Sequence, residues 1–192
     1  MKIKLSIICL VSMLFCSTGS SGFEPVPNLS RGVQSARLAA NPLYNCPAVS
    51  RPGKRQIKSQ TFPFNFQPFN DTCFVTFGST EAMLDEKDLP RGSTFHLYRN
   101  GQAVLDLPDG FDGQEGCWVE AVAFKDLNRD GLTDIIIAGK CLGARDSYPQ
   151  NAIFVNTGKD FTTNSQANQR LESFTKLSAI ETFVKRNLKI FF

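Results

Sequence analysis

The sequence has few of the residues and motifs that common enzyme families use. It holds a single histidine, His96, and contains no G-x-S-x-G, P-loop or H-E-x-x-H motif. His96 stands beside Phe95 and Leu97 in an apolar stretch, where a lone histidine is more often a residue of a sheet surface than a general base. These absences argue against catalysis, and we expect a protein that is not an enzyme.

A strong excess of charge is also missing. The 192 residues include 21 Lys and Arg against 18 Asp and Glu, a formal net charge of +3. Residues 1–22 hold two lysines and no acid, so the rest has 19 basic against 18 acidic residues, or +1. The basic stretch RPGKRQIK at 51–58 lies in Pro-containing sequence and indicates a solvated linker. Because a nucleic-acid binder usually needs a strongly basic face, we expect no nucleic-acid partner.

No apolar run is long enough to cross a membrane as a helix, which takes about 20 residues. The run from Leu5 to Phe15 has eleven residues, follows Lys2 and Lys4, and precedes the small residues CSTGSSG. These three regions are typical of a secretory signal peptide over residues 1–22. We expect an exported protein, secreted or periplasmic, with no transmembrane segment in the mature chain. A lipid anchor on Cys16 is less favoured, because Phe15 replaces the small residue that usually precedes a lipidated cysteine.

No two cysteines form a C-x-x-C motif, which disfavours a zinc ribbon or a redox site. Four cysteines remain after the signal peptide: Cys46, Cys73, Cys117 and Cys141. In an exported protein this set indicates two disulfides, for which three connectivities exist.

Residues 23–60 indicate an irregular N-terminal arm, since prolines and small polar residues interrupt any periodicity. Over residues 61–192 we expect a single β-rich domain. TFPFNF and TCFVTF are rich in strand-forming residues, and Pro63 favours an edge strand. Asn100-Gly101, between STFHLYR and QAVLDLP, predicts a type I′ hairpin turn.

The second half of this domain predicts further strands and a C-terminal helix. CWVEAVAF and IIIAGKC are rich in β-branched and aromatic residues, and AIFVNTGKDF predicts another hairpin. Ile180 and Val184 belong to a helical apolar stripe, which predicts a helix over about residues 179–187. Ser178 and Glu181 form a capping-box pattern at its start. We expect the apolar stripe to pack on the sheet.

The nine residues DLNRDGLTD, at 126–134, join two of the predicted strands. Oxygen-bearing side chains stand at positions 1, 3, 5 and 9 of a D-x-N-x-D-G-x-x-D pattern, namely Asp126, Asn128, Asp130 and Asp134. Gly131 at position 6 allows a sharp turn, and the carbonyl of Leu132 at position 7 adds a backbone oxygen. Calcium takes six to eight oxygen ligands, so the pattern predicts a structural calcium site.

Position 12 of this loop is Ile137 instead of the bidentate Glu of an EF-hand. We therefore expect weak calcium binding, on the order of 10⁻⁴–10⁻³ M. An acidic surface turn without a metal, or a catalytic or sensing metal, are the alternatives.

A hairpin closed by this loop has a testable register. Pairing Phe124 with Asp134 places opposite each other residues whose numbers sum to 258, as Cys117 and Cys141 also do. Directly opposed strand residues lie within reach of a disulfide, so we expect Cys117–Cys141 and, for the remaining pair, Cys46–Cys73. In this register one face carries Val119, Ala121, Ala123, Ile135 and Ile137, and the other carries Trp118, Val122, Phe124 and Ile136. Both faces are mainly apolar, which predicts a hairpin buried on both sides.

The segment AVAFKDLNRDGLTDIIIAG resembles the calcium loop of FG-GAP/VCBS-type repeats, which lies between strands of β-propeller blades. The likeness extends from Trp118 to Phe161 and implies a calcium ion held by the oxygens of Asp126, Asn128, Asp130, Leu132 and Asp134. Because a propeller needs several blades and one such loop is present, we do not expect a closed propeller. We predict a mainly β (α+β) fold, with antiparallel sheets that resemble one or two blades, and a C-terminal helix.

Size, export, one calcium loop and a C-terminal helix are similar, more loosely, to small exported bacterial proteins that include periplasmic lysozyme inhibitors. This resemblance implies a non-catalytic protein that binds a protein or glycan of the cell envelope and inhibits a cell-wall hydrolase. One alternative is a small envelope hydrolase built on the carboxylates of Asp109, Asp112 and Glu115. The other is a structural module of a surface assembly.

Overall fold

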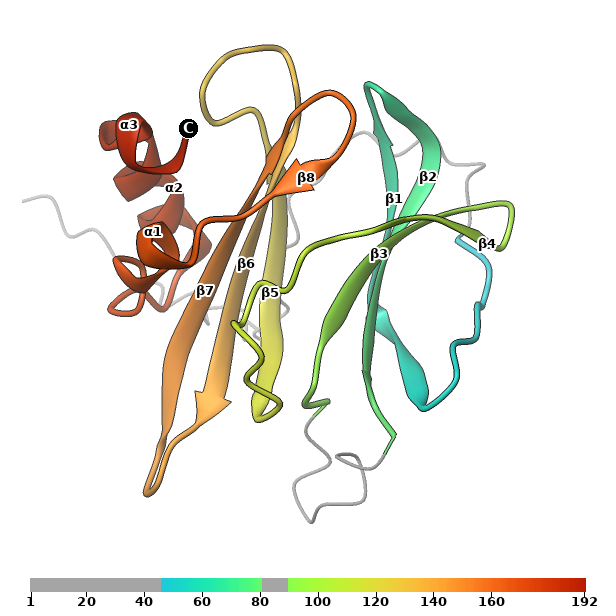
Figure 1. Ribbon diagram of the computed structural model, residues 1–192, viewed down its shortest axis with the longest axis horizontal. Helices are drawn as coiled ribbons and strands as arrows, with labels where there is room; N and C mark the ends of the chain where they lie inside the picture. The colour runs from blue at the N-terminus through green and yellow to red at the C-terminus, as the bar shows by residue number, and fades with distance from the viewer. Residues whose placement is uncertain (1–45, 81–89) are drawn as a thin grey trace, which may run out of the picture. The chain divides into compact units, whose positions relative to one another are not determined.

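The computed structural model describes residues 46–80 and 90–192 (Figure 1). The predicted signal peptide, Cys16 and residues 23–45 of the predicted arm lie outside the described residues. The described chain forms two four-stranded antiparallel sheets followed by three short helices. This confirms a mainly β fold with a helical C-terminus. Among the described residues, no helix has the length and apolar character needed to cross a membrane.

The first sheet has the strand order β1-β2-β3-β4. Its strands are β1 (Lys54–Phe66), β2 (Phe69–Ser79), β3 (Thr94–Arg99) and β4 (Gln102–Asp106). Residues 54–60, which we predicted to be irregular, therefore belong to a strand. Pro63 lies in the edge strand β1, where a missing backbone N–H is tolerated, as predicted.

The predicted hairpin turn at Asn100-Gly101 is confirmed. Both residues have positive φ, 51° for Asn100 and 80° for Gly101, and Arg99 pairs with Gln102 on either side. A type I′ turn needs positive φ at both central positions, and Asn followed by Gly adopts it at little cost.

The second sheet has the strand order β5-β6-β7-β8. Its strands are β5 (Cys117–Lys125), β6 (Asp134–Leu142), β7 (Ser147–Asn156) and β8 (Phe161–Thr162). The segments predicted as strands lie within these elements, but β7 begins at Ser147, before the predicted segment that starts at Ala152. The hairpin that joins β7 to β8 begins at Asn156, as expected.

Both predicted disulfides are present. Cys46 and Cys73 are bonded with their Cα atoms 5.8 Å apart, and Cys117 is bonded to Cys141 directly across the β5–β6 pair. The first ties the chain before β1 to β2, and the second closes the open end of the β5–β6 hairpin.

The predicted register of that hairpin is correct near the disulfide and wrong near the loop. Cys117 pairs with Cys141, but an irregularity at Glu120 shifts every later pair by one residue. Asp134 therefore lies opposite Lys125, and the predicted pairing of Phe124 with Asp134 is wrong. A bulge inserts one extra residue into one strand, which counting from a loop cannot detect.

The bulge also exchanges the faces of the residues that follow it. Val119 lies in the same buried cluster as Val122 and Phe124, whereas Ala121 and Ala123 face the other way. The predicted division of faces is therefore wrong after Glu120. The hairpin is nonetheless buried on both sides, as predicted.

The main core lies between the two sheets and is rich in phenylalanine. Phe64, Phe74 and Phe95 of the first sheet meet Phe124 and Phe154 of the second, all at most 8% exposed. Edge-on ring contacts join them, with centroids 5.2 Å apart for Phe64 and Phe124. Each buried ring contributes roughly 1.5–3 kcal/mol of transfer free energy, so this cluster holds the sheets together.

The three helices lie on the other face of the second sheet (Figure 1). They are α1 (Ser165–Gln169), α2 (Leu177–Arg186) and α3 (Leu188–Phe191). Ile180 and Val184 of α2 are fully buried, which confirms that its apolar stripe packs on the sheet. The predicted capping box is wrong, because the N-cap is Lys176 and no side chain caps the helix.

Candidate functional site

The loop of residues 126–134 joins β5 to β6 and folds around the carboxylate of its first residue. Asp126 Oδ1 accepts a hydrogen bond from the Arg129 backbone N–H (2.7 Å), and Oδ2 accepts one from the Gly131 N–H (3.0 Å). Arg129 and Gly131 have φ of 66° and 86°, in the left-handed region. The chain turns sharply here, and Gly131 serves the role that the sequence predicted for it.

Asn128 and Asp130 are bonded to each other within the loop. Asn128 Nδ2 donates to Asp130 Oδ2 (2.8 Å), and the Asp130 backbone N–H donates to Asn128 Oδ1 (3.1 Å). Asp130 Oδ1 accepts from the Leu132 N–H at 2.8 Å. The side chains of the loop are thus ordered by the loop's own hydrogen bonds.

Asp134 is fully buried at the first residue of β6. Its Oδ2 accepts from the Leu127 N–H and its Oδ1 from the Asn156 N–H, both at 3.0 Å. Burial raises the pKa of Asp134 to about 6, and the charges of Asp130 and Asp126 act in the same direction. The two backbone hydrogen bonds oppose this shift. Asp134 therefore joins the loop to the end of β7.

The oxygen atoms of this loop suit a hard cation, but its carboxylates do not converge as they lie. In residues 46–80 and 90–192, no three acidic, histidine or cysteine side chains gather closely enough to hold a metal ion. Asp126, Asp130 and Asp134 each turn at least one oxygen toward a backbone amide. Within the same residues none of the three is paired with Lys or Arg. The loop thus carries acidic groups that no described basic side chain neutralises.

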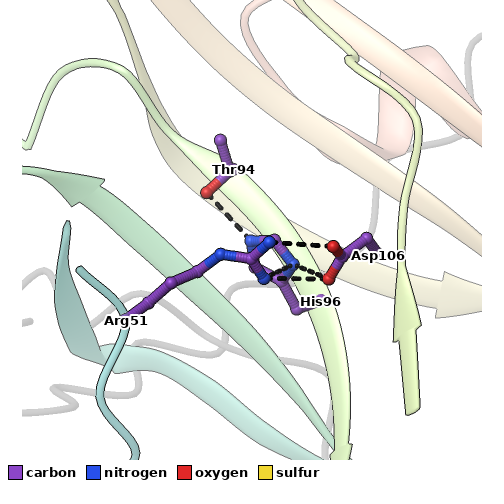
Figure 2. A network of polar contacts seen from close by, with 4 residues as sticks. All are labelled: Arg51, Thr94, His96 and Asp106. Carbon is purple, nitrogen blue, oxygen red and sulfur yellow. Dashed lines mark hydrogen bonds and ion pairs between the residues drawn. The ribbon is translucent and has the colours of Figure 1, made fainter. Parts of the chain in front are cut away.

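A second polar cluster, which we call the Arg51 cluster, consists of Arg51, Thr94, His96 and Asp106 (Figure 2). Thr94 and His96 lie on β3, Asp106 ends β4 directly opposite His96, and Arg51 precedes β1. The guanidinium binds the Asp106 carboxylate through two hydrogen bonds, Nη1 to Oδ1 (2.9 Å) and Nη2 to Oδ2 (2.8 Å). Such a bidentate pair is a strong and geometrically specific contact.

His96 is buried inside this cluster, with a side chain only 6% exposed. Its Nδ1 lies 2.6 Å from Asp106 Oδ1 and 2.8 Å from Arg51 Nη1. Its Nε2 lies 3.0 Å from Thr94 Oγ1. Both ring nitrogens are therefore engaged by neighbouring side chains.

The charges of the cluster shift one another's pKa values. Burial lowers the pKa of His96 below its ordinary 6.5, the hydrogen bond with Asp106 opposes this, and the Arg51 charge lowers it further. The hydrogen bonds from Arg51 hold the pKa of Asp106 well below its ordinary 3.8. These shifts favour a neutral His96 and an ionised Asp106.

His96 and Asp106 line a groove of about 410 Å³, which we call the His96 groove. Its other polar residues come from β1, the start of β3 and the loop after β4, and include Lys54, Ser93, Thr94, Asp109, Gln114 and Glu115. Lys54 Nζ donates to the Gly92 carbonyl (2.9 Å) and retains two further N–H groups. The volume lies within the range of small-ligand sites in proteins.

The loop that forms one wall of the groove is anchored to the core. Phe111 is 1% exposed and packs edge-on against Phe95, with ring centroids 5.8 Å apart. Asp109 accepts from the backbone N–H groups of Phe111 (2.8 Å) and Gly113. The wall is therefore held by a buried ring and a capped turn.

The three acids proposed above for a hydrolase do not form one centre. Asp109 and Glu115 both line the His96 groove, but the oxygens of Asp109 are taken by backbone N–H groups. Asp112 instead accepts a hydrogen bond from Ser165 at the start of α1. The structure thus brings together two of the three, Asp109 and Glu115, both of which are exposed.

Arg51 and Asp106 were not predicted as site residues from the sequence. Arg51 belongs to the stretch interpreted as a solvated linker. The pairing of Asp106 with His96 depends on an extra residue between Ala103 and Leu105. Counting outward from the turn would place Leu105 opposite His96, so the bulge conceals the pair. An acid close to the only histidine across a hairpin was the available signal.

No protein-family model, no curated protein and no solved structure matches this chain. The likeness of residues 126–134 to FG-GAP/VCBS repeats therefore stays a prediction from the sequence.

Proposed function

We propose that this chain is an exported, non-catalytic binding protein that holds its partner in the His96 groove. A single calcium ion in the loop of residues 126–134 stabilises it. The observation that carries this proposal is the groove, whose polar side chains come from the first sheet and from the loop after β4. The Cys46–Cys73 disulfide braces that sheet, and buried Phe111 anchors the loop to the core. A site built on rigid elements binds with little loss of conformational freedom.

The surroundings of His96 favour binding over catalysis. A general base needs a nitrogen within reach of the substrate, and both nitrogens of His96 already contact side chains of the cluster. Asp106, His96 and Thr94 stand in the order of a nucleophilic triad. In such a triad the carboxylate stabilises the imidazolium that forms, but here Arg51 binds both oxygens of that carboxylate. Asp106 therefore gives little additional stabilisation to a protonated His96.

The charge of the loop supports the calcium ion. Asp126 and Asp130 lie close enough to raise the pKa of Asp134, and no described Lys or Arg pairs with any of the three. Carboxylate, amide and carbonyl oxygens are the ligands that calcium prefers. Asp126, Asn128, Asp130 and Asp134 would hold the ion with the Leu132 carbonyl, and the ion would supply the missing positive charge. The predicted resemblance of the two sheets to β-propeller blades rests on the same likeness of this loop to FG-GAP/VCBS repeats.

Export is supported by the signal-peptide pattern of residues 1–22, and the two disulfides are compatible with an oxidising compartment. The partner would then be a protein or glycan of the cell envelope. The sharpest form of the proposal, which rests on the looser resemblance to lysozyme inhibitors, is inhibition of a cell-wall hydrolase.

Lysozyme assays on cell-wall substrate test this form directly. We expect the purified protein to lower the rate in a concentration-dependent way, and Glu115→Lys to weaken inhibition because Glu115 is exposed in the groove. Glu172→Lys is the matched control, since it makes the same charge change at an exposed residue outside the groove lining. Absence of inhibition across lysozyme types would remove the inhibitor hypothesis. Equal inhibition by both variants would place binding outside the groove.

A further inference from the structure

His96 and Arg51 share one carboxylate, and this makes the Arg51 cluster sensitive to a single proton. Figure 2 shows the guanidinium and the imidazole ring converging on Asp106. Asp106 Oδ1 lies 2.6 Å from His96 Nδ1 and 2.9 Å from Arg51 Nη1. Because His96 is the one histidine of the chain, its protonation state can be followed without ambiguity.

The contacts assign the proton of neutral His96 to Nδ1. The 2.6 Å contact with Asp106 needs a hydrogen between the two atoms, since both otherwise present lone pairs. Nε2 then accepts from the Thr94 hydroxyl at 3.0 Å. In this tautomer Arg51 Nη1 donates to Asp106, and its approach to Nδ1 within 2.8 Å is a contact between two donors. A second proton adds a full positive charge to the ring beside the guanidinium, which makes this contact more repulsive.

We propose that His96 is an acid-sensitive latch on residues 46–51, the segment that leads into β1. When the ring takes up a second proton, its charge expels Arg51 from Asp106 and the segment loses its hold on β3 and β4. Protonation also requires Nε2 to donate, so the Thr94 hydroxyl must rotate its hydrogen away and accept through its oxygen.

Arg51 is the cation that leaves, because His96 cannot. The Arg51 side chain is 34% exposed and can turn into water, whereas His96 is 6% exposed and fixed within β3. Within residues 46–80 and 90–192, the other charged or titratable groups around the ring offer no second anion in contact. Lys54 of β1 adds positive charge, Tyr98 of β3 contacts the ring edge-on, and Asp109 and Glu115 line the groove without a hydrogen bond to the ring.

The released segment remains part of the domain. The Cys46–Cys73 disulfide keeps its start on β2, and the Lys54 N–H bonds the Arg51 carbonyl (3.1 Å) at its end. Between these points the Val49 N–H donates to Gln56 Oε1 (2.8 Å). Val49 is therefore a reporter of whether the segment lies on the sheet.

The latch would make binding in the groove depend on pH, because His96 and Asp106 line the groove. This role rests on the proposed binding function. The test of the latch needs no ligand. Loss of lysozyme inhibition with a working latch would contradict only the inhibitor hypothesis. Inhibition without a pH-dependent latch would contradict only the latch.

The experiment is an NMR titration of the full chain between about pH 8 and pH 4, a range that spans ordinary histidine ionisation. The His96 Cε1–H, the Arg51 side-chain N–H and the Val49 amide are observed together. We expect the Arg51 and Val49 signals to shift with the midpoint of His96, and Val49 to lose protection from hydrogen exchange in the acid form. Static Arg51 and Val49 signals through the His96 titration would overturn the latch, as would a His96 that stays neutral throughout.

Three variants sharpen the result. Arg51→Gln should raise the His96 midpoint by removing the opposing cation, and Asp106→Asn should lower it by removing the anion. His96→Gln should leave the Arg51 and Val49 signals unchanged across the range. If His96→Gln fails to fold, the opposite shifts in the other two variants decide the question, and shifts in the same direction would contradict the proposal.

Discussion

The loop of residues 126–134 and the Arg51 cluster both hold carboxylates in fixed positions, but they use different hydrogen-bond donors. In the loop, Asp126, Asp130 and Asp134 take hydrogen bonds from backbone N–H groups, nearly all within nine residues of sequence. In the cluster, Asp106 takes its bonds from the side chains of Arg51 and His96, which the fold brings together from distant positions.

The difference lies in the net charge that each arrangement leaves. Backbone amides orient carboxylates without cancelling their charge, so the loop remains anionic and is suited to an added cation. In the cluster, the positive charge of Arg51 balances the negative charge of Asp106 when His96 is neutral. The loop is therefore expected to respond to calcium, and the cluster to the protonation of His96.

The largest expected effect comes from removing the buried acid of the loop. Asp134→Ala leaves the buried N–H groups of Leu127 and Asn156 without partners, and each such loss costs about 1–3 kcal/mol. Urea unfolding in the presence of a chelator should show a loss of about 2–5 kcal/mol. Asp146→Ala, at an exposed acid, is the control, and an equally small loss for both variants would contradict the structural role of Asp134.

Calcium should have the next largest effect. With a dissociation constant on the order of 10⁻⁴–10⁻³ M, about 10 mM calcium should stabilise the fold by about 1.5–3 kcal/mol. Thermal unfolding measures this as a rise in Tm. The double variant Asp126→Asn with Asp130→Asn should lose most of the rise. A rise of the same size in that variant would place the ion elsewhere.

The smallest expected effect is the pH dependence of the cluster. The folded-state pKa of His96 lies below its ordinary 6.5, so its contribution to stability is present above that value and is lost as pH falls through the folded pKa. His96→Gln should therefore flatten the stability profile over this window, by less than about 1 kcal/mol, the scale of partly exposed ion pairs. A steeper dependence of stability on pH in His96→Gln than in the unaltered protein would contradict a lowered pKa of His96.

Features determined by a few neighbouring residues could be predicted from the sequence. Asn100-Gly101 identified its hairpin because positive φ is a property of those two residues. The loop pattern correctly placed Gly131 at a left-handed position and the flanking segments in strands. The Cys117–Cys141 bond was predicted correctly from a pairing, Phe124 with Asp134, that is wrong by one residue, because the bulge at Glu120 offsets that error.

Features that depend on distant contacts could not be predicted. The bulge at Glu120 changes which residues face the core, and no local pattern announces an extra residue in a strand. Arg51 has the composition of a linker, yet the Cys46–Cys73 bond and the strand β1 bring it to Asp106. The groove could not be anticipated, because its lining comes from β1, β3 and the loop after β4.

The central claim, that the loop binds calcium while the cluster does not, is tested most directly by a calcium titration followed through backbone amide NMR signals. At about 10 mM calcium, we predict large shifts at Leu127, Gly131 and Leu132 and none at Val49 or His96. Unchanged signals for residues 126–134, or equal shifts in both regions, would contradict it.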